Sequence, residues 1–209
     1  MEKLVELVMD LKRGEVGETV ARRIDEFKRT GMEGDERWFS ELCFCILTAN
    51  SSAKLGIKIQ EELGSDGFIH LPFSTLVKKL REAGHRFYSQ RARFIVAARR
   101  YLKIKEILLE MEDPTEMREW LASNVLGIGY KEASHFLRNV GFLDFAILDR
   151  HILSLMKENG IIDWGGGALT RRRYLEYEKK FCSMAKRVKM PPGELDLFLW
   201  YLKTGEVLK

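Results

Sequence analysis

The stretch LGIGYKEASHFLRNVGFLDFAILDRHI, residues 126–152, decides how this sequence is interpreted. Two glycines, Gly127 and Gly129, stand one residue apart and are followed closely by Lys131. An amphipathic run comes next, and Asp149 opens a second one. Packing alone does not require this arrangement, so the stretch points to ligand binding or to catalysis.

The two glycines lie between two helical patterns. Glycine adopts positive φ readily, so Gly127 and Gly129 allow a tight turn that exposes backbone N–H groups. Those groups point along the start of the next helix, where the helix dipole favours an anion such as a DNA phosphate. A simple interhelical turn is the alternative explanation for a G-x-G sequence.

Lys131 and Asp149 carry the chemical interpretation. Lys131 falls in the first turn of the helix that follows the glycines, where the dipole disfavours an ammonium and favours the nucleophilic amine. Asp149 has the position of an N-cap, where the dipole keeps a carboxylate ionised. Alone, each has an ordinary explanation, an exposed lysine or a helix cap, but together behind the turn they predict a catalytic pair. His135 and His151 lie nearby and are left out of the catalytic set, because most helix histidines are structural.

Length and composition limit the classes of protein to which the chain can belong. The 209 residues suit one compact domain or one domain of two lobes, and 45% hydrophobic residues can form a core. A net charge of +4 and a pI near 8.9 permit a polyanionic partner without requiring one. The 32% charged residues favour, weakly, a heat-stable protein from a thermophile.

Several classes are excluded. The acidic, amphipathic start MEKLVELVMD does not resemble a signal peptide, and no apolar run is long enough to span a membrane. The odd number of cysteines argues against a disulfide framework. Cys43 and Cys45 lie in an apolar run and are expected to be buried, while Cys182 stands alone. An intracellular, cytoplasmic location is expected.

The fold class predicted from periodicity is all-α. Residues 37–49 are too densely apolar for a surface helix and are expected at the centre. Residues 91–112 are predicted to form one long amphipathic helix. Asp113-Pro114-Thr115 should end it and start the next helix.

Basic residues are concentrated between residues 78 and 105, where ten Lys or Arg accompany a single acid. Within this segment HRFYSQRAR places arginines beside Phe87 and Tyr88, a pattern typical of nucleic-acid surfaces. Arg91 and Arg93 are therefore predicted to contact the DNA backbone. A solvated helix face is the alternative.

GIGYK followed by AILDRHI resembles the signature of the helix-hairpin-helix (HhH-GPD) DNA glycosylase superfamily. A lysine two residues after the second glycine resembles its bifunctional glycosylase/lyase branch. The chain length, ELCFCILTANSSA and LFLWYLKTGEVLK are similar to archaeal-type 8-oxoguanine DNA glycosylases. The resemblance implies a two-lobed helical fold forming one catalytic domain over residues 1–209, with the helix-hairpin-helix element at about 115–141.

Two departures from the superfamily pattern are visible. The segment between the hairpin helix and Asp149 contains Gly141 but no proline. The four C-terminal cysteines of the iron–sulfur relatives are absent, so no iron–sulfur cluster is expected. This separates the chain from endonuclease III-like and adenine-glycosylase-like members.

The resemblance implies a mechanism without a redox cofactor or a catalytic metal. A damaged base is flipped out of double-stranded DNA, Asp149 stabilises positive charge on the sugar, and Lys131 attacks C1′ to form a Schiff base. β-Elimination then cuts the strand. The expected substrates are 8-oxoguanine and abasic sites, handled by a monomer. A non-enzymatic helix-hairpin-helix module that grips the DNA backbone, and a glycosylase/lyase for another damaged base, are the alternatives.

The resemblance also implies binding residues. Backbone carbonyls around Gly127 and Gly129 could hold a structural monovalent cation beside a phosphate. Phe87 and Trp200 are expected to sandwich the flipped base, with core packing as the alternative. The carboxylate of Lys209 is expected to accept the N7 hydrogen of 8-oxoguanine, with a frayed terminus as the alternative.

Overall fold

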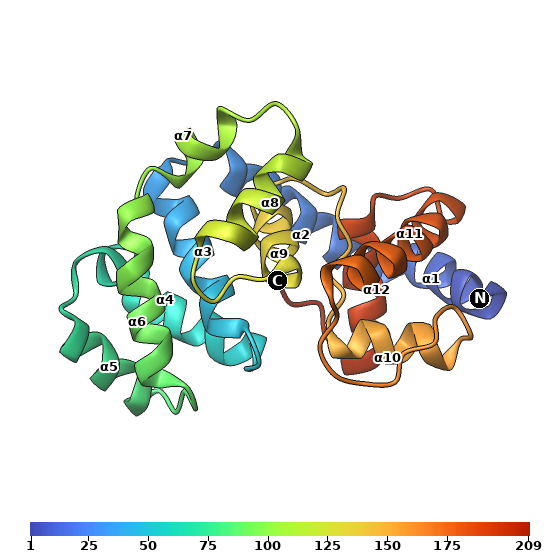
Figure 1. Cartoon of the computed structure of the whole chain (residues 1–209). Helices are drawn as coiled ribbons and strands as arrows, with labels where there is room; N and C mark the ends of the chain where they lie inside the picture. Colours follow the sequence, from blue (N-terminus) through green and yellow to red (C-terminus); the bar gives the residue numbers. More distant parts are fainter. The chain divides into compact units, whose positions relative to one another are not determined.

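The computed structural model describes residues 1–209 and contains helices but no strand, which confirms the all-α prediction. It divides into two compact units: Met1–Lys28 with Gly141–Lys209, and Arg29–Val140. No helix combines the length and the apolar character that crossing a membrane requires. The elements, labelled in Figure 1, are α1 (Glu2–Lys12), α2 (Glu15–Met32), α3 (Asp35–Thr48), α4 (Ala53–His70), α5 (Phe73–Glu82), α6 (Tyr88–Ala98), the 3₁₀ helix η1 (Arg99–Tyr101), α7 (Ile104–Leu109), α8 (Pro114–Asn124), α9 (Tyr130–Asn139), α10 (Arg150–Glu158), α11 (Arg171–Arg187) and α12 (Pro192–Thr204).

Helix α3 forms the centre of the unit Arg29–Val140. All its residues from Trp38 to Thr48 are buried, and it packs against α4, α6, α7 and α9, as Figure 1 lets the reader follow. This confirms the central helix expected from residues 37–49. Cys43 and Cys45 are buried in it, and burial raises the pKa of the Cys43 thiol. Both cysteines therefore serve as small apolar side chains.

The prediction of one long helix over residues 91–112 is wrong. The segment is divided into α6, η1 and α7. At the break, the Arg99 guanidinium donates to the carbonyls of Phe68 and Leu71, 2.9 and 2.6 Å away, at the end of α4. Asp35 accepts the Lys105 N–H at 2.7 Å and so caps the first turn of α7. These contacts come from distant segments, which local periodicity does not report.

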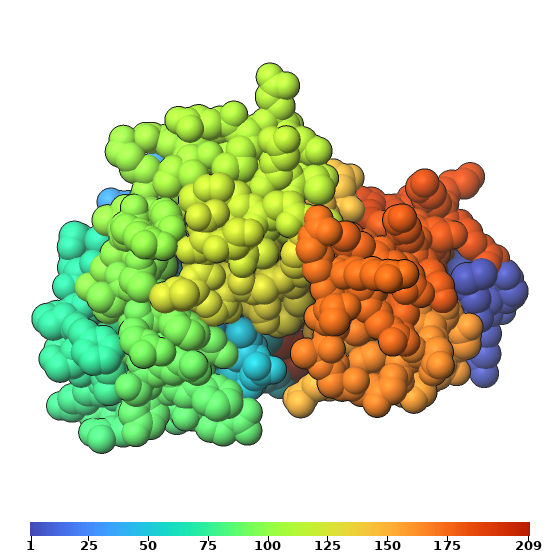
Figure 2. Space-filling view, viewed as in Figure 1, coloured from blue at the N-terminus to red at the C-terminus, as the bar shows by residue number.

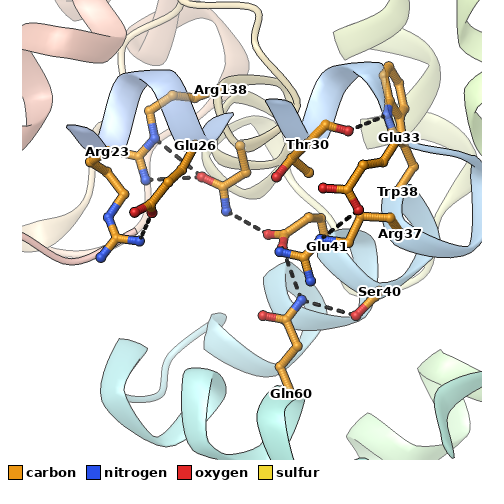
Figure 3. A network of polar contacts seen from close by, with 11 residues as sticks. Arg23, Glu26, Thr30, Glu33, Arg37, Trp38, Ser40, Glu41, Gln60 and Arg138 are labelled. Carbon is orange, nitrogen blue, oxygen red and sulfur yellow. Dashed lines mark hydrogen bonds and ion pairs between the residues drawn. The ribbon is translucent and has the colours of Figure 1, made fainter. Parts of the chain in front are cut away.

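A buried polar network ties α9 to α3 and α4 (Figure 3). Glu41 is 1% exposed and accepts hydrogen bonds from the side-chain amides of Gln60 and Asn139, both at 3.1 Å. Arg37 forms an ion pair with the same carboxylate at 3.1 Å. A buried charge is tolerated when it is paired and hydrogen-bonded in this way. The network fixes the end of the helix whose first turn carries Lys131.

The other unit is organised around α12, which packs against α1, α10 and α11. Helix α11 also fixes the extended segment that leads into α10. The Tyr174 hydroxyl donates to the Ala146 carbonyl at 2.7 Å and accepts the Leu148 N–H at 3.3 Å. Glu178 accepts the Ala146 N–H at 3.1 Å. These buried contacts set the position of Asp149, the next residue after the segment.

Candidate active site

The hairpin between α8 and α9 depends on a glycine at one position. Gly127 has a φ of +84°, and a Cβ added there would lie 2.5 Å from the Phe94 ring. Both the backbone conformation and the packing therefore exclude a larger residue. Leu126 beside it is 54% exposed, and Figure 2 shows the yellow-green turn at the surface of its unit. Helix α8 begins as expected, because the Asp113 side chain accepts the Thr115 N–H at 2.8 Å.

Lys131 occupies the second position of α9, and its neighbour Glu132 holds it. The Lys131 Nζ lies 2.8 Å from Glu132 Oε1, and Glu132 Oε2 accepts the Gly129 N–H at 3.2 Å. The dipole argument for a neutral amine did not take this adjacent carboxylate into account. The Gly129 N–H is likewise engaged by Glu132 rather than open to an anion.

One of the hairpin carbonyls that the resemblance implied for a cation is already hydrogen-bonded. The Gly129 carbonyl already accepts the Ala133 N–H at 2.8 Å, as the first hydrogen bond of α9. The structure therefore gives no support to the implied monovalent cation, and no chemical step is assigned to it. No group of three or more His, Cys, Asp or Glu side chains is placed to hold a metal ion.

The two arginines predicted at the DNA backbone differ in their surroundings. Arg93 is exposed, with its guanidinium carbon 5.7 Å from the Phe94 ring centre. Arg91 is only 5% exposed and donates to the Ala49 carbonyl. The DNA contact of Arg91 stays a prediction; its guanidinium lies 3.3 Å from the Cβ position of Gly127 and supports the turn that contains this glycine.

Phe87 is half-buried beneath two guanidinium groups. The carbons of Arg86 and Arg91 lie 4.6 and 5.7 Å from its ring centre. Its N–H donates to Nδ1 of the buried His85 at 3.1 Å, and His85 Nε2 lies 2.9 Å from the Leu47 carbonyl. His85 thus fixes the backbone at Phe87. Sequence reasoning missed this histidine, because only the fold brings it to the end of α3.

Asp149 is the N-cap of α10. Its Oδ1 accepts the N–H groups of His151 and Ile152 at 2.8 and 2.9 Å, which confirms the predicted cap. Trp200 of α12 lies beside the same turn, with its ring centre 5.0 Å from that of His151 in an edge-to-face arrangement. The Trp200 indole N–H is buried and has no hydrogen-bond partner. An unpaired buried donor is costly unless a ligand satisfies it.

The tail after α12, residues 206–209, is partly buried. Gly205, with φ of +76°, ends the helix, and the Thr204 hydroxyl accepts the Glu206 N–H at 3.3 Å. Residues 206–209 are all half-buried. The tail therefore departs from the frayed terminus that was the alternative for Lys209.

The candidate residues are distributed over both units. Asp149, Trp200 and Lys209 belong to the unit with Met1–Lys28 and Gly141–Lys209, while the remaining six, Phe87, Arg91, Arg93, Gly127, Gly129 and Lys131, belong to Arg29–Val140. Each unit thus contributes one of the two charged residues predicted to be catalytic.

The arrangement of helices is that of the endonuclease III fold. A solved endonuclease III–DNA complex matches with a TM-score of 0.53 and 17% identity, over 88% of this chain and 84% of that chain. At this identity the match shows the fold alone. The structure therefore places the chain in the class of helical, HhH-GPD-type folds, as the resemblance implied.

The chain belongs to the 8-oxoguanine DNA glycosylase family, whose model matches residues 20–190. The 8-oxoguanine DNA glycosylase/AP lyase of Methanocaldococcus jannaschii is 50% identical over 206 residues, covering 99% of each chain. The crystal structure of the glycosylase/lyase from that organism with a DNA 15-mer containing 8-oxoguanine matches with a TM-score of 0.97 and 49% identity, over 99% of this chain and 100% of that chain. The resemblance seen in the sequence is confirmed.

Proposed function

We propose that this protein is a bifunctional DNA repair enzyme, a monomer that excises 8-oxoguanine from double-stranded DNA and cleaves the strand at the abasic site. The observation that carries the proposal is Lys131 at the second position of α9, directly behind the Gly127 turn. The chain around it is 50% identical to a glycosylase/AP lyase over its whole length. The exposed Arg93 and the hairpin would contact the DNA backbone.

Base excision is assigned to Asp149. Breaking the bond between C1′ and the base leaves positive charge on the sugar, which a fixed carboxylate stabilises. Two backbone N–H groups hold Asp149 Oδ1 in place. The flipped base needs an aromatic platform and polar partners. Trp200 supports this role with its ring beside His151 and its unpaired indole N–H. Phe87 and the tail ending in Lys209 are proposed as the further base contacts.

Strand cleavage is assigned to Lys131. The lone pair of its neutral amine forms the Nζ–C1′ bond as the bond from C1′ to the base breaks and the base leaves with a proton. Ring opening then gives an imine between Nζ and C1′. The imine acidifies C2′, so a base removes a C2′ proton and the C3′–O bond breaks. The 3′ phosphate is the leaving group, and neither a metal nor a redox step is needed.

A comparison of Asp149→Asn with Asp113→Asn tests the proposal. Each aspartate caps a helix, and asparagine is an equally good cap, so neither variant should lose stability. Base release from an 8-oxoguanine duplex should fall by a factor of roughly 100 or more in Asp149→Asn and stay near wild type in Asp113→Asn. A protein that binds the duplex but releases no base in its wild-type form is a non-enzymatic binding module instead. Release of another damaged base in preference would redirect the substrate assignment.

A further inference from the structure

Glu132 contacts the amine of Lys131 in a way that helix geometry does not require. Side chains of consecutive helix residues do not normally face each other. Glu132 is the third residue of α9 and reaches back to the Gly129 N–H at 3.2 Å, so its carboxylate lies over the first turn. The second carboxylate oxygen then meets the Lys131 Nζ at 2.8 Å. One side chain thus joins the hairpin backbone to the proposed nucleophile.

Helix capping explains only part of this arrangement. In a capping box, a glutamate at the third helical position accepts the N–H of the cap residue. Here the cap residue is Gly129, which has no side chain to complete the box. The side chains of Lys131 and Glu132 are 23% and 13% exposed, so water screens their ion pair only partly. The pair is consequently more than a surface contact.

A second cation acts on the same carboxylate. Burial lowers the pKa of Arg91, and the negative charge of Glu132 opposes this shift. Arg91 lies on α6, while Lys131 lies on the helix of Glu132 itself. Arg118 of α8 also packs against this turn, with its guanidinium carbon 5.3 Å from the Tyr130 ring centre. The carboxylate of Glu132 thus interacts with a cation of α6 as well as with Lys131 on its own helix.

We propose that Glu132 is a positioning residue for Lys131, holding its Nζ in one orientation at the first turn of α9. This role rests on the proposed function, because it gives Lys131 a reason to be held. The contact with Glu132 restricts the amine to one orientation, which favours attack on C1′.

Glu132→Gln separates positioning from capping. Glutamine serves equally well at the third position of a capping box, so the Gly129 N–H stays satisfied. The variant removes the charge beside Nζ and places an amide N–H₂ there, which cannot accept a hydrogen bond from the ammonium. Strand cleavage of a preformed abasic duplex would be measured in single turnover with saturating protein, from about pH 5 to about pH 9. With saturating protein, the measured rate does not depend on how tightly a variant binds DNA.

We expect the plateau of the pH–rate profile to fall by roughly tenfold in Glu132→Gln, because the amine is no longer oriented. The free energy of unfolding should stay near wild type, because glutamine still caps the helix. In Glu132→Asp the carboxylate is kept but its reach is shortened, so the plateau should fall as well. Glu116→Gln, at the third position of α8, is the matched control and should change neither quantity.

An unchanged plateau rate in Glu132→Gln overturns the proposal and leaves Glu132 as a cap. A plateau loss matched by a comparable loss of folding stability overturns it too, because the effect would then be structural. Lys131→Gln is measured in the same assay, so that failure of this proposal can be told apart from failure of the proposed function. Cleavage that survives Lys131→Gln refutes the assignment of the nucleophile itself, whatever Glu132 does.

Discussion

His85 accepts a hydrogen bond from the Phe87 N–H at Nδ1, over 3.1 Å, while its Nε2 lies 2.9 Å from the Leu47 carbonyl. These partners require Nδ1 to be an acceptor and Nε2 to carry the hydrogen, which only the neutral imidazole provides. Burial is the main cause that lowers the pKa of His85, and the charges of Arg91 and Arg86 lower it further against the Leu47 hydrogen bond. The backbone at Phe87 is therefore fixed by a neutral histidine.

The first prediction is a loss of stability in mild acid that depends on His85. Below the ordinary value of 6.5 the unfolded histidine binds a proton while the native one does not. The free energy of unfolding should thus decrease progressively below that pH, towards the lowered native pKa. Denaturant unfolding at about pH 7.5 and about pH 5.5 should show this decrease in wild type and in the exposed control His70→Gln. The decrease should be smaller in His85→Gln, and an equal decrease there would contradict the assignment.

The second prediction concerns the hairpin glycine. Gly127 and Gly84 have the same φ of +84°, but only at Gly127 does an added Cβ meet a neighbour, the Phe94 ring at 2.5 Å. Gly84→Ala should lower the free energy of unfolding by about 1–2 kcal/mol through backbone strain alone. Gly127→Ala should cost about 2–4 kcal/mol, because overpacking adds to the strain. Equal losses by chemical denaturation would show that the contact with Phe94 does not matter.

The third prediction separates the two arginines. Arg93→Ala should weaken binding to damaged and undamaged duplexes alike and reduce the salt dependence of binding, because Arg93 is exposed. Arg91→Ala should instead lower stability by about 1–3 kcal/mol, since it removes the buried donor to the Ala49 carbonyl. Titrations at several salt concentrations and thermal melts of both variants check this. The reverse pattern would return Arg91 to the DNA-binding surface.

How far the fold could be predicted depended on the range of the interactions. The central position of α3, the cap at Asp113 and the all-α class follow from local patterns. The division of residues 91–112 does not, because the contacts found at the break, such as those of Arg99, are to carbonyls some thirty residues earlier in the chain. Amphipathic periodicity continues across such a break, because it shows which face of a segment is apolar. It does not show where the backbone hydrogen bonds of one helix stop.

For the candidate site, too, the range of each interaction decided whether it could be predicted. The cap formed by Asp149 could be anticipated because capping involves residues two and three positions away. The ion pair of Lys131 with Glu132 also joins neighbours, yet it escaped notice because consecutive helix residues normally point apart. The burial of Arg91 could not be foreseen, because a basic segment gives no sign of which arginine turns inward. Chemical roles could thus be proposed from the sequence, whereas most of the contacts around these residues could not.

The fourth prediction concerns the tail. Deleting Lys209 should reduce excision of 8-oxoguanine by roughly tenfold or more, because a site built around a polar group of the base loses a partner. Cleavage of a preformed abasic duplex should remain within about threefold of wild type, since that substrate has no base to recognise. Lys203→Ala, which removes an ion pair between the end of α12 and Glu158 of α10, is the control for indirect effects. Parallel losses in both assays would remove the tail from base recognition.

The central claim is that Lys131 is the nucleophile. Incubating the protein with an 8-oxoguanine duplex and borohydride should reduce the imine to a stable covalent adduct, and peptide mapping should place the DNA on Lys131. Lys131→Gln should form no adduct while still binding the duplex, and Lys157→Gln, a lysine on α10, should form it at the wild-type yield. An adduct in Lys131→Gln, or one mapped to another residue, would contradict the account.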